Sequence, residues 1–143
     1  MRTLALDVGT RTIGVAVSDP LGIIAQPVTT IQRTGRKADT AAVMAIVVER
    51  EVGAVVVGLP LRQDGTEGDS AKEARRQAVA VENAIGEADL QVPVLFQDER
   101  YTTAQAERSL IKQGMRRKKR KKVIDQIAAV LILQSHLEAG GRR

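Results

Sequence analysis

The fold is decided by residues 4–19, which read LALDVGTRTIGVAVSD. An apolar run reaches Asp7, a short segment containing Gly9 follows, and a second apolar run comes next. This pattern predicts one strand over residues 4–7, a tight turn, and a second strand over residues 13–18. A carboxylate inside an apolar strand is costly unless a partner or a ligand compensates its charge. Asp7 is therefore a candidate functional residue, although an aspartate before a glycine can also simply shape a turn.

The rest of the chain alternates between strand and helix patterns. A third strand is expected at a sheet edge, because Pro27 cannot donate a hydrogen bond to a neighbouring strand. Ser70 and Glu73 form the pattern of a capping box at the start of a helix, and Thr102 or Thr103 is a plausible cap for the next one. The expected strands are 23–31, 54–57 and 92–97, and the expected helices are 37–50, 70–85, 102–113 and 122–138. This order predicts an α/β domain with a mixed sheet.

The charge of the chain points to a polyanionic partner. Its formal net charge is +5, from 22 basic and 17 acidic residues. Seven consecutive cations favour nucleic acid as that partner, although a charged run can also be a solvated segment. Phe96 and Tyr101 are the only aromatic residues, so phosphate contacts should dominate over base stacking and make binding steeply salt-dependent. The run comprises Arg116, Arg117, Lys118, Lys119, Arg120, Lys121 and Lys122.

Composition also excludes several classes of protein. The chain has no cysteine, so it needs no oxidising compartment and offers no thiolate nucleophile. The apolar runs are shorter than the roughly 18–20 residues that span a bilayer, and the chain begins directly in strand-like sequence. We expect a cytoplasmic protein without a membrane partner, folded as a single domain over residues 1–143.

Carboxylates recur at three places where solvation alone explains them poorly. Besides Asp7, they are Asp98 and Glu99 after the predicted strand 92–97, and Asp125 in the last helix. Asp125 precedes Ala128, Ala129 and Ile132 at helical spacing, so an apolar face should carry it toward the sheet. Each of these carboxylates also has a structural explanation. Asp98 or Glu99 could cap a helix or pair with Arg100, and Asp125 could pair with a nearby lysine.

Gathered carboxylates repel one another, and hard divalent cations remove that conflict. Mg²⁺ and Mn²⁺ prefer oxygen ligands and need few protein carboxylates, because water and phosphate complete their coordination. Two such ions about 3.5–4 Å apart can clamp the attacking and leaving oxygens of a phosphodiester. The single histidine, His136, lies among leucines near the end of the last helix and is better explained as a structural residue.

Four sequence blocks in this order resemble the YqgF/RuvX family of pre-16S rRNA nucleases and Holliday-junction-resolvase-like proteins. They are residues 6–19 (LDVGTRTIGVAVSD), 58–68 (GLPLRQDGTEG), 98–103 (DERYTT) and 124–133 (IDQIAAVLIL). The blocks cover nearly the whole chain, and they are specific together rather than singly. Two features depart from the family pattern: Ile124 replaces a commoner valine, and the seven-residue basic run is longer than the pattern requires.

The resemblance implies an RNase H-like fold, with a mixed five-stranded sheet flanked by helices. It implies that Asp7, the acidic pair Asp98 and Glu99, and Asp125 are catalytic, with Asp7, Glu99 and Asp125 binding Mg²⁺ or Mn²⁺. Glu99 is favoured over Asp98 as the ligand. Arg11 and Arg100 match basic positions that would neutralise phosphate beside the basic run. The implied activity is hydrolysis of phosphodiester bonds in the 5′-end maturation of pre-16S rRNA, or in branched or single-stranded DNA.

Two other functions compete with this one at the level of sequence. The opening motif also resembles the phosphate loop of actin, Hsp70 and sugar-kinase ATPases, but those proteins enclose ATP between two lobes and this chain is long enough for one. A non-catalytic RNA-binding factor in ribosome assembly would equally explain the basic run. The oligomeric state stays open between monomer and homodimer, since a junction cutter would gain from two-fold symmetry.

Overall fold

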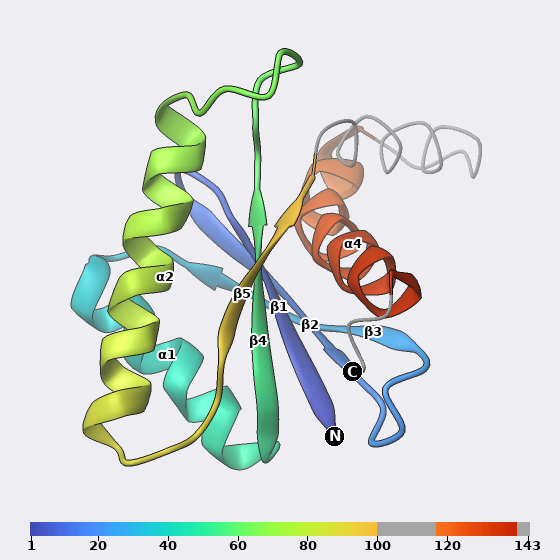
Figure 1. The fold of residues 1–143 in the computed structure, drawn as a ribbon. Coiled ribbons are helices and arrows are strands. Elements are labelled where there is room, and N and C mark those ends of the chain that lie inside the picture. The colour runs from blue at the N-terminus through green and yellow to red at the C-terminus, as the bar shows by residue number, and fades with distance from the viewer. Residues whose placement is uncertain (100–116, 140–143) are drawn as a thin grey trace.

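A mixed five-stranded sheet forms the centre of the molecule (Figure 1). The computed structural model describes residues 1–99 and 117–139, with side chains from residue 126 onward in the second range. The strand order is β3-β2-β1-β4-β5. The first three strands form an antiparallel meander, whereas β1, β4 and β5 run parallel. The strands are β1 (Arg2–Val8), β2 (Thr12–Ser18), β3 (Ala25–Gln32), β4 (Val52–Leu59) and β5 (Val94–Asp98).

Helices cover both faces of this sheet. Helices α1 (Arg36–Glu49) and α2 (Asp69–Glu87) pack on one face, and α4 (Arg117–Glu138) crosses the other and contacts all five strands (Figure 1). The predicted α/β class, mixed sheet and edge position of the third strand are therefore confirmed. The helix expected at 102–113 lies outside the described residues. Helix α4 begins at Arg117 rather than 122, so six of the seven cations form its first turns.

Side-chain alternation along β1 divides the core in two. Leu4, Leu6 and Val8 belong to the larger apolar cluster, beneath α1 and α2. Ala5 belongs to the smaller one, beneath α4, together with Ala16 and Val56. Small residues at these positions let α4 approach the sheet closely. Since side chains alternate with a period of two, Asp7 follows Ala5 on the α4 face.

The start of α2 differs from the prediction. Its N-cap is Gly68, with no side-chain cap hydrogen bond, and Ser70 is already the second residue of the helix. Glu73 instead accepts hydrogen bonds from Arg33 and Arg36, at 2.7 and 2.8 Å. The capping-box prediction is thus wrong, because two guanidinium groups from outside the helix engage the carboxylate that was expected to bind the N-cap amide.

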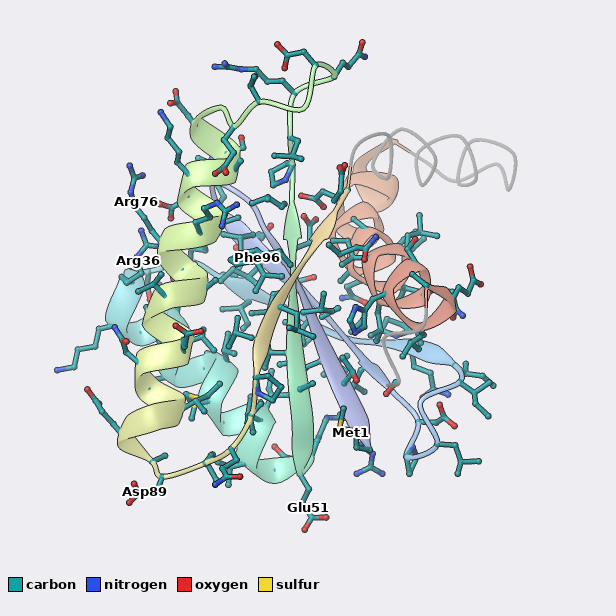
Figure 2. All side chains as sticks on the ribbon, viewed as in Figure 1. Met1, Arg36, Glu51, Arg76, Asp89 and Phe96 are labelled. Atoms are coloured by element: carbon teal, nitrogen blue, oxygen red, sulfur yellow. The ribbon has the colours of Figure 1, made fainter. Side chains whose placement is uncertain are left out.

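The side chains of Arg36 and Arg76 lie on the α1/α2 side of the sheet, away from α4 (Figure 2). Phe96 of β5 also belongs to that side, where the Arg75 guanidinium lies 4.8 Å from its ring centroid. Within the described ranges, no helix is long and apolar enough to cross a membrane.

Candidate active site

The parallel strands bring two carboxylates to one edge of the sheet. Asp7 is the penultimate residue of β1, and Glu99 directly follows β5. Strand β4 lies between them, and the main-chain N–H of Glu99 donates to Leu59 O at 3.2 Å. Neighbouring strands are about 4.8 Å apart, so β1 and β5 are separated by roughly 10 Å. The Glu99 side chain must therefore reach back across β4 to approach Asp7.

Gly58 provides the space for that reach. A Cβ built on Gly58 would lie 2.8 Å from Glu99 Oε2 and 2.5 Å from Ile132 Cδ1 of α4. Both distances are shorter than real Cβ contacts, so any side chain at position 58 would displace the carboxylate or the helix. The sequence reasoning missed this role. A glycine after a β-branched run, next to a carboxylate-bearing strand, is the signal in the sequence from which this role of Gly58 could have been predicted.

Glu99 is buried, with 7% of its surface exposed, and its charge is strongly disfavoured. Burial raises its pKa to about 9, with further contributions from the charge of Asp7, a hydrogen bond with the Asp7 side chain and the charge of Asp98. In the described part of the chain, Glu99 Oε2 is a buried atom without a hydrogen-bond partner. Without a cation, the Glu99 carboxyl group is therefore protonated at neutral pH and hydrogen-bonded with the Asp7 side chain.

The structure separates the two adjacent acidic residues. Asp98 is exposed at the end of β5, whereas Glu99 is buried and hydrogen-bonded to Asp7. The family resemblance favours Glu99 as the ligand, which agrees with the buried position of Glu99 beside Asp7. Successive side chains of an extended segment point to opposite sides, so Glu99 faces inward where Asp98 faces solvent.

The other expected site residues fall into two groups. Arg11 is exposed in the turn between β1 and β2, four residues after Asp7. Asp125 lies in α4, seven residues before Ile132 and on the same helix face by its spacing, but its side chain is outside the described set. The same holds for the side chains of Arg117, Lys118, Lys119, Arg120, Lys121 and Lys122, and for all of Arg100 and Arg116.

His136 has the properties of a structural residue. It is 8% exposed on α4, and burial lowers its pKa. Its Nε2 atom has no hydrogen-bond partner in the described structure. A neutral imidazole among apolar neighbours agrees with the structural interpretation of this residue.

A divalent cation fits the chemistry of Asp7 and Glu99. Both supply oxygen, the charges of the two groups disfavour each other, and Glu99 Oε2 lacks a partner. The residues that the structure describes contain no group of three or more potential ligands. The described part of the site is therefore a two-carboxylate arrangement, to which Asp125 is the sequence-based candidate for a third ligand.

Comparison with known proteins identifies the family. The family model described as "RuvX: Holliday junction resolvase" matches residues 1–139. The chain belongs to this family. A relative in Myxococcus xanthus, named "Putative pre-16S rRNA nuclease", is 48% identical over 139 residues, covering 97% of this chain and 89% of the relative. A relative of the same name in Listeria innocua is 48% identical over 140 residues, covering 96% and 98%. The family resemblance drawn from the four sequence blocks is confirmed.

Solved structures show the same fold at low sequence identity. RuvC of T. thermophilus in complex with a Holliday junction matches with a TM-score of 0.59 and 17% identity, covering 98% of this chain and 96% of that one. The fowlpox virus Holliday junction resolvase matches with a TM-score of 0.60 and 12% identity, covering 97% and 99%. The expected RNase H-like fold is thereby confirmed.

Proposed function

We propose that this chain is a divalent-metal-dependent nuclease that hydrolyses phosphodiester bonds, acting in the 5′-end maturation of pre-16S rRNA. The observation that carries the proposal is the convergence of Asp7 and Glu99 over Gly58, with a buried carboxylate oxygen lacking a partner. Family membership and the names of the relatives support the same activity. They favour it over ATP binding of the actin, Hsp70 or sugar-kinase type. Residues 1–143 form one nuclease domain in this proposal.

Asp7, Glu99 and Asp125 would hold the cation, Mg²⁺ or Mn²⁺. When bound there, a divalent cation supplies Lewis-acid stabilisation of phosphate and lowers the pKa of water. Asp7 and Glu99 contribute by losing the proton of the Glu99 carboxyl group and presenting two anionic oxygens at the open edge of the sheet. The hydrogen bond from the Glu99 amide to Leu59 holds the second ligand on a rigid strand end. The finer hypothesis of two ions rests on the number of carboxylates. A metal titration would measure how many ions bind to each chain.

Nucleic acid would be held mainly through its phosphates. Arg11 and Arg100 flank the proposed ligands in sequence and would neutralise phosphate near the scissile bond. The basic run at the start of α4 would extend this contact along the backbone. Structured RNA is the proposed substrate, because the relatives are named for pre-16S rRNA. Branched DNA is the second substrate to test, because the matching family is described as a Holliday junction resolvase.

The decisive experiment is the Asp7→Asn variant. Wild-type protein and D7N are incubated with a pre-16S rRNA fragment and with a four-way DNA junction, each with Mg²⁺ or Mn²⁺. We expect the wild type to cleave and D7N to lose at least about 100-fold of that activity, because one anionic ligand is removed without changing side-chain size. Binding of both proteins to the same substrates in EDTA should be equal within a factor of about two.

Two outcomes would overturn the proposal. Cleavage by D7N at the wild-type rate would remove Asp7 from the site. Absence of cleavage by the wild type on both substrates with both metals, together with tight binding, would favour a non-catalytic RNA-binding factor of ribosome assembly instead.

A further inference from the structure

The turn that follows Asp7 is short and lightly packed. Residues 9–11 connect β1 to β2, and the Gly9 amide donates to Thr12 O at 2.8 Å. Thr10 and Arg11 are exposed, and Gly9 has no side chain, so none of the three residues anchors the turn in the core. Asp7 lies two residues before the turn, opposite Gly14 in the β1–β2 ladder, so the turn closes the end of the ladder that carries Asp7 and also carries the Arg11 side chain.

Behind the turn, on the α1/α2 side, lies a cavity of about 580 Å³. Val8, Gly9 and Thr10 line it from the strand side, and Ser70 and Glu73 line it from the first turns of α2. Close packing normally restricts the motion of a backbone segment. Here the space behind the turn is open, so close packing does not hold the turn in place from that direction.

Arg33 holds the turn at two points, one through its main chain and one through its side chain, which crosses this gap and is the one that a substitution removes. Its main-chain amide donates to Arg11 O at 2.9 Å, and its side-chain Nη1 donates to Gly9 O at 2.8 Å. Both acceptors are main-chain carbonyls of the turn itself. Two bonds to carbonyls two residues apart restrain the position and also the orientation of the turn.

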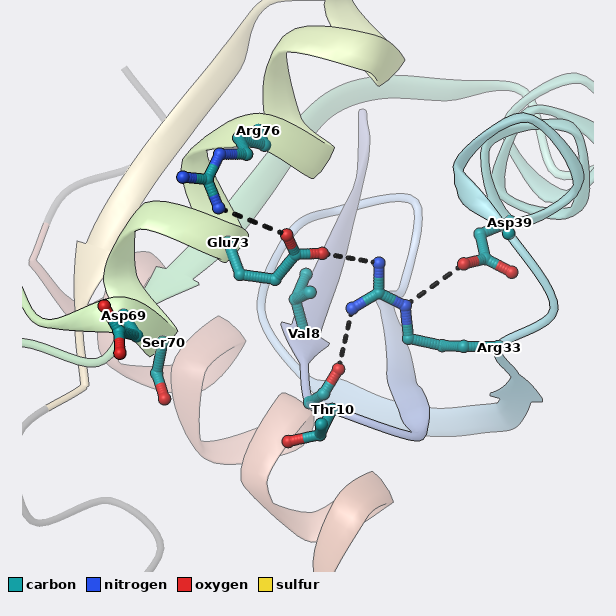
Figure 3. Close-up of a pocket in the computed structure, with 10 residues that line it drawn as sticks. Val8, Thr10, Arg33, Asp39, Asp69, Ser70, Glu73 and Arg76 are labelled. Atoms are coloured by element: carbon teal, nitrogen blue, oxygen red, sulfur yellow. Dashed lines mark hydrogen bonds and ion pairs between the residues drawn. The ribbon is translucent and has the colours of Figure 1, made fainter.

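Arg33 is itself fixed by carboxylates from the two helices behind it (Figure 3). Its Nε lies 3.1 Å from Asp39 Oδ2 of α1, and its Nη2 lies 2.7 Å from Glu73 Oε2 of α2. Asp39 is 1% exposed, and its second oxygen accepts a hydrogen bond from the Thr34 amide at 3.0 Å. The planar guanidinium can satisfy these acceptors together with Gly9 O because its donors point in several fixed directions.

We propose that Arg33 is a positioning residue of the active site, which holds the β1–β2 turn, and through it Asp7 and Arg11, in place across the cavity. The proposal rests on the nuclease function proposed above. In this role Arg33 acts through the backbone of the turn.

Arg36 offers a matched control on the same network. Its Nη1 lies 2.8 Å from Glu73 Oε2 and donates to Gln77 Oε1 at 3.1 Å, so it shares two acceptors with Arg33. The hydrogen bonds described for its guanidinium run to Glu73 and Gln77 of α2 and not to the turn. Replacing Arg36 should therefore perturb the ion-pair network without releasing residues 9–11.

The test compares Arg33→Ala and Arg33→Lys with Arg36→Ala and the wild type. Cleavage is measured as kcat and KM, and amide hydrogen exchange is measured over residues 9–12. We expect R33A to lower kcat by about 10- to 100-fold, since small misplacements of catalytic groups have effects of that size. Exchange of the turn should accelerate in R33A, and R33K should fall between R33A and the wild type. R36A should keep wild-type kcat and turn exchange.

A purely structural role would lower the melting temperature of R33A and R36A alike and leave the kcat of the folded protein unchanged. Equal kcat and equal turn exchange in R33K, R33A and the wild type would overturn the proposal. If R33A does not fold, R33K carries the test, because it keeps the cation. If the wild type cleaves nothing, the proposed nuclease function fails, while hydrogen exchange still tells whether Arg33 holds the turn.

Discussion

The two faces of the sheet place a glutamate in opposite electrostatic surroundings. On the α1/α2 face, hydrogen bonds and charge from Arg36 and Arg33 lower the pKa of Glu73 to about 2. On the α4 face, burial, Asp7 and Asp98 together raise the pKa of Glu99 to about 9. One glutamate is neutralised by arginines of the same chain, and the other is placed beside further acids.

In the proposed function, this difference distinguishes a structural charge, that of Glu73, from a functional one, that of Glu99. The ion pairs of Glu73 connect α1 and α2 and stabilise the folded chain with groups that it already contains. The arrangement around Glu99 costs stability in the absence of a cation, and such costs concentrate at active sites. The charge that Glu99 needs would come with a bound metal and would leave when that metal is removed.

The largest expected effect comes from removing the space that lets Glu99 reach Asp7. Gly58→Ala would place a methyl group 2.8 Å from Glu99 Oε2 and 2.5 Å from Ile132 Cδ1. We expect metal-dependent cleavage to fall by about 100-fold, because the carboxylate must move from its position beside Asp7. Cleavage kinetics and Mn²⁺ affinity measured without substrate would check this.

Two control variants distinguish displacement of the Glu99 carboxylate from displacement of helix α4. Ile132→Val removes Cδ1, so the double variant G58A/I132V should regain stability but not cleavage. Gly86→Ala in α2 meets no atom within 4 Å and should keep activity while gaining about 0.5–1 kcal/mol of stability. Full recovery of cleavage in G58A/I132V would show that the helix, and not the carboxylate, had been displaced.

The two glutamates should also give the metal-free protein opposite pH dependences. The folded-state pKa of Glu99 is above its ordinary value of 4.5, so its contribution lowers stability as pH rises from about 4.5 to about 9. The folded-state pKa of Glu73 is below 4.5, so its contribution is present above that pH and is lost as pH falls toward 2. Urea unfolding in EDTA across this range measures both.

Variants that cannot titrate isolate each contribution. At pH 8, Glu99→Gln should be more stable than the wild type. The wild-type Glu99 carboxyl group must stay protonated in the folded state at a pH where it is ionised in the unfolded state, and glutamine removes that cost. At pH 7, Glu73→Gln should be less stable by about 1–3 kcal/mol, and that difference should shrink below pH 4. If E99Q is destabilised at pH 8 in EDTA, the comparison between the two faces fails.

The smallest expected effect concerns the basic run on the α4 side. Replacing Lys118, Lys119 and Lys121 with alanine should weaken binding to the rRNA fragment and flatten the dependence of log Kd on log salt concentration. Each lost phosphate contact reduces that slope by about 0.7–0.9. Binding titrations at several salt concentrations in EDTA would show it. An unchanged slope would assign the run to a solvated face.

The sequence alone determined the elements and the family. Apolar periodicity is local, so the meander, the buried strand before Gly58 and the apolar face of α4 could be predicted from spacing. Asp7, the pair Asp98 and Glu99, and Asp125 are candidates from sequence because solvation alone explains carboxylates poorly at these places, and the family blocks contain the same positions. Prediction failed at Ser70 and Glu73, where a local capping pattern competed with arginines from a distant segment.

Only the tertiary structure decided which groups meet. Strand order places β4 between the two carboxylate-bearing strands, and this order makes the missing side chain of Gly58 decisive. Which member of the pair Asp98 and Glu99 is buried beside Asp7 depends on the side that each faces at the end of β5. The role inferred for Arg33 depends on Glu73, 40 residues away in sequence. Spacing along a chain reports contacts within one element, whereas these contacts join elements that only folding brings together.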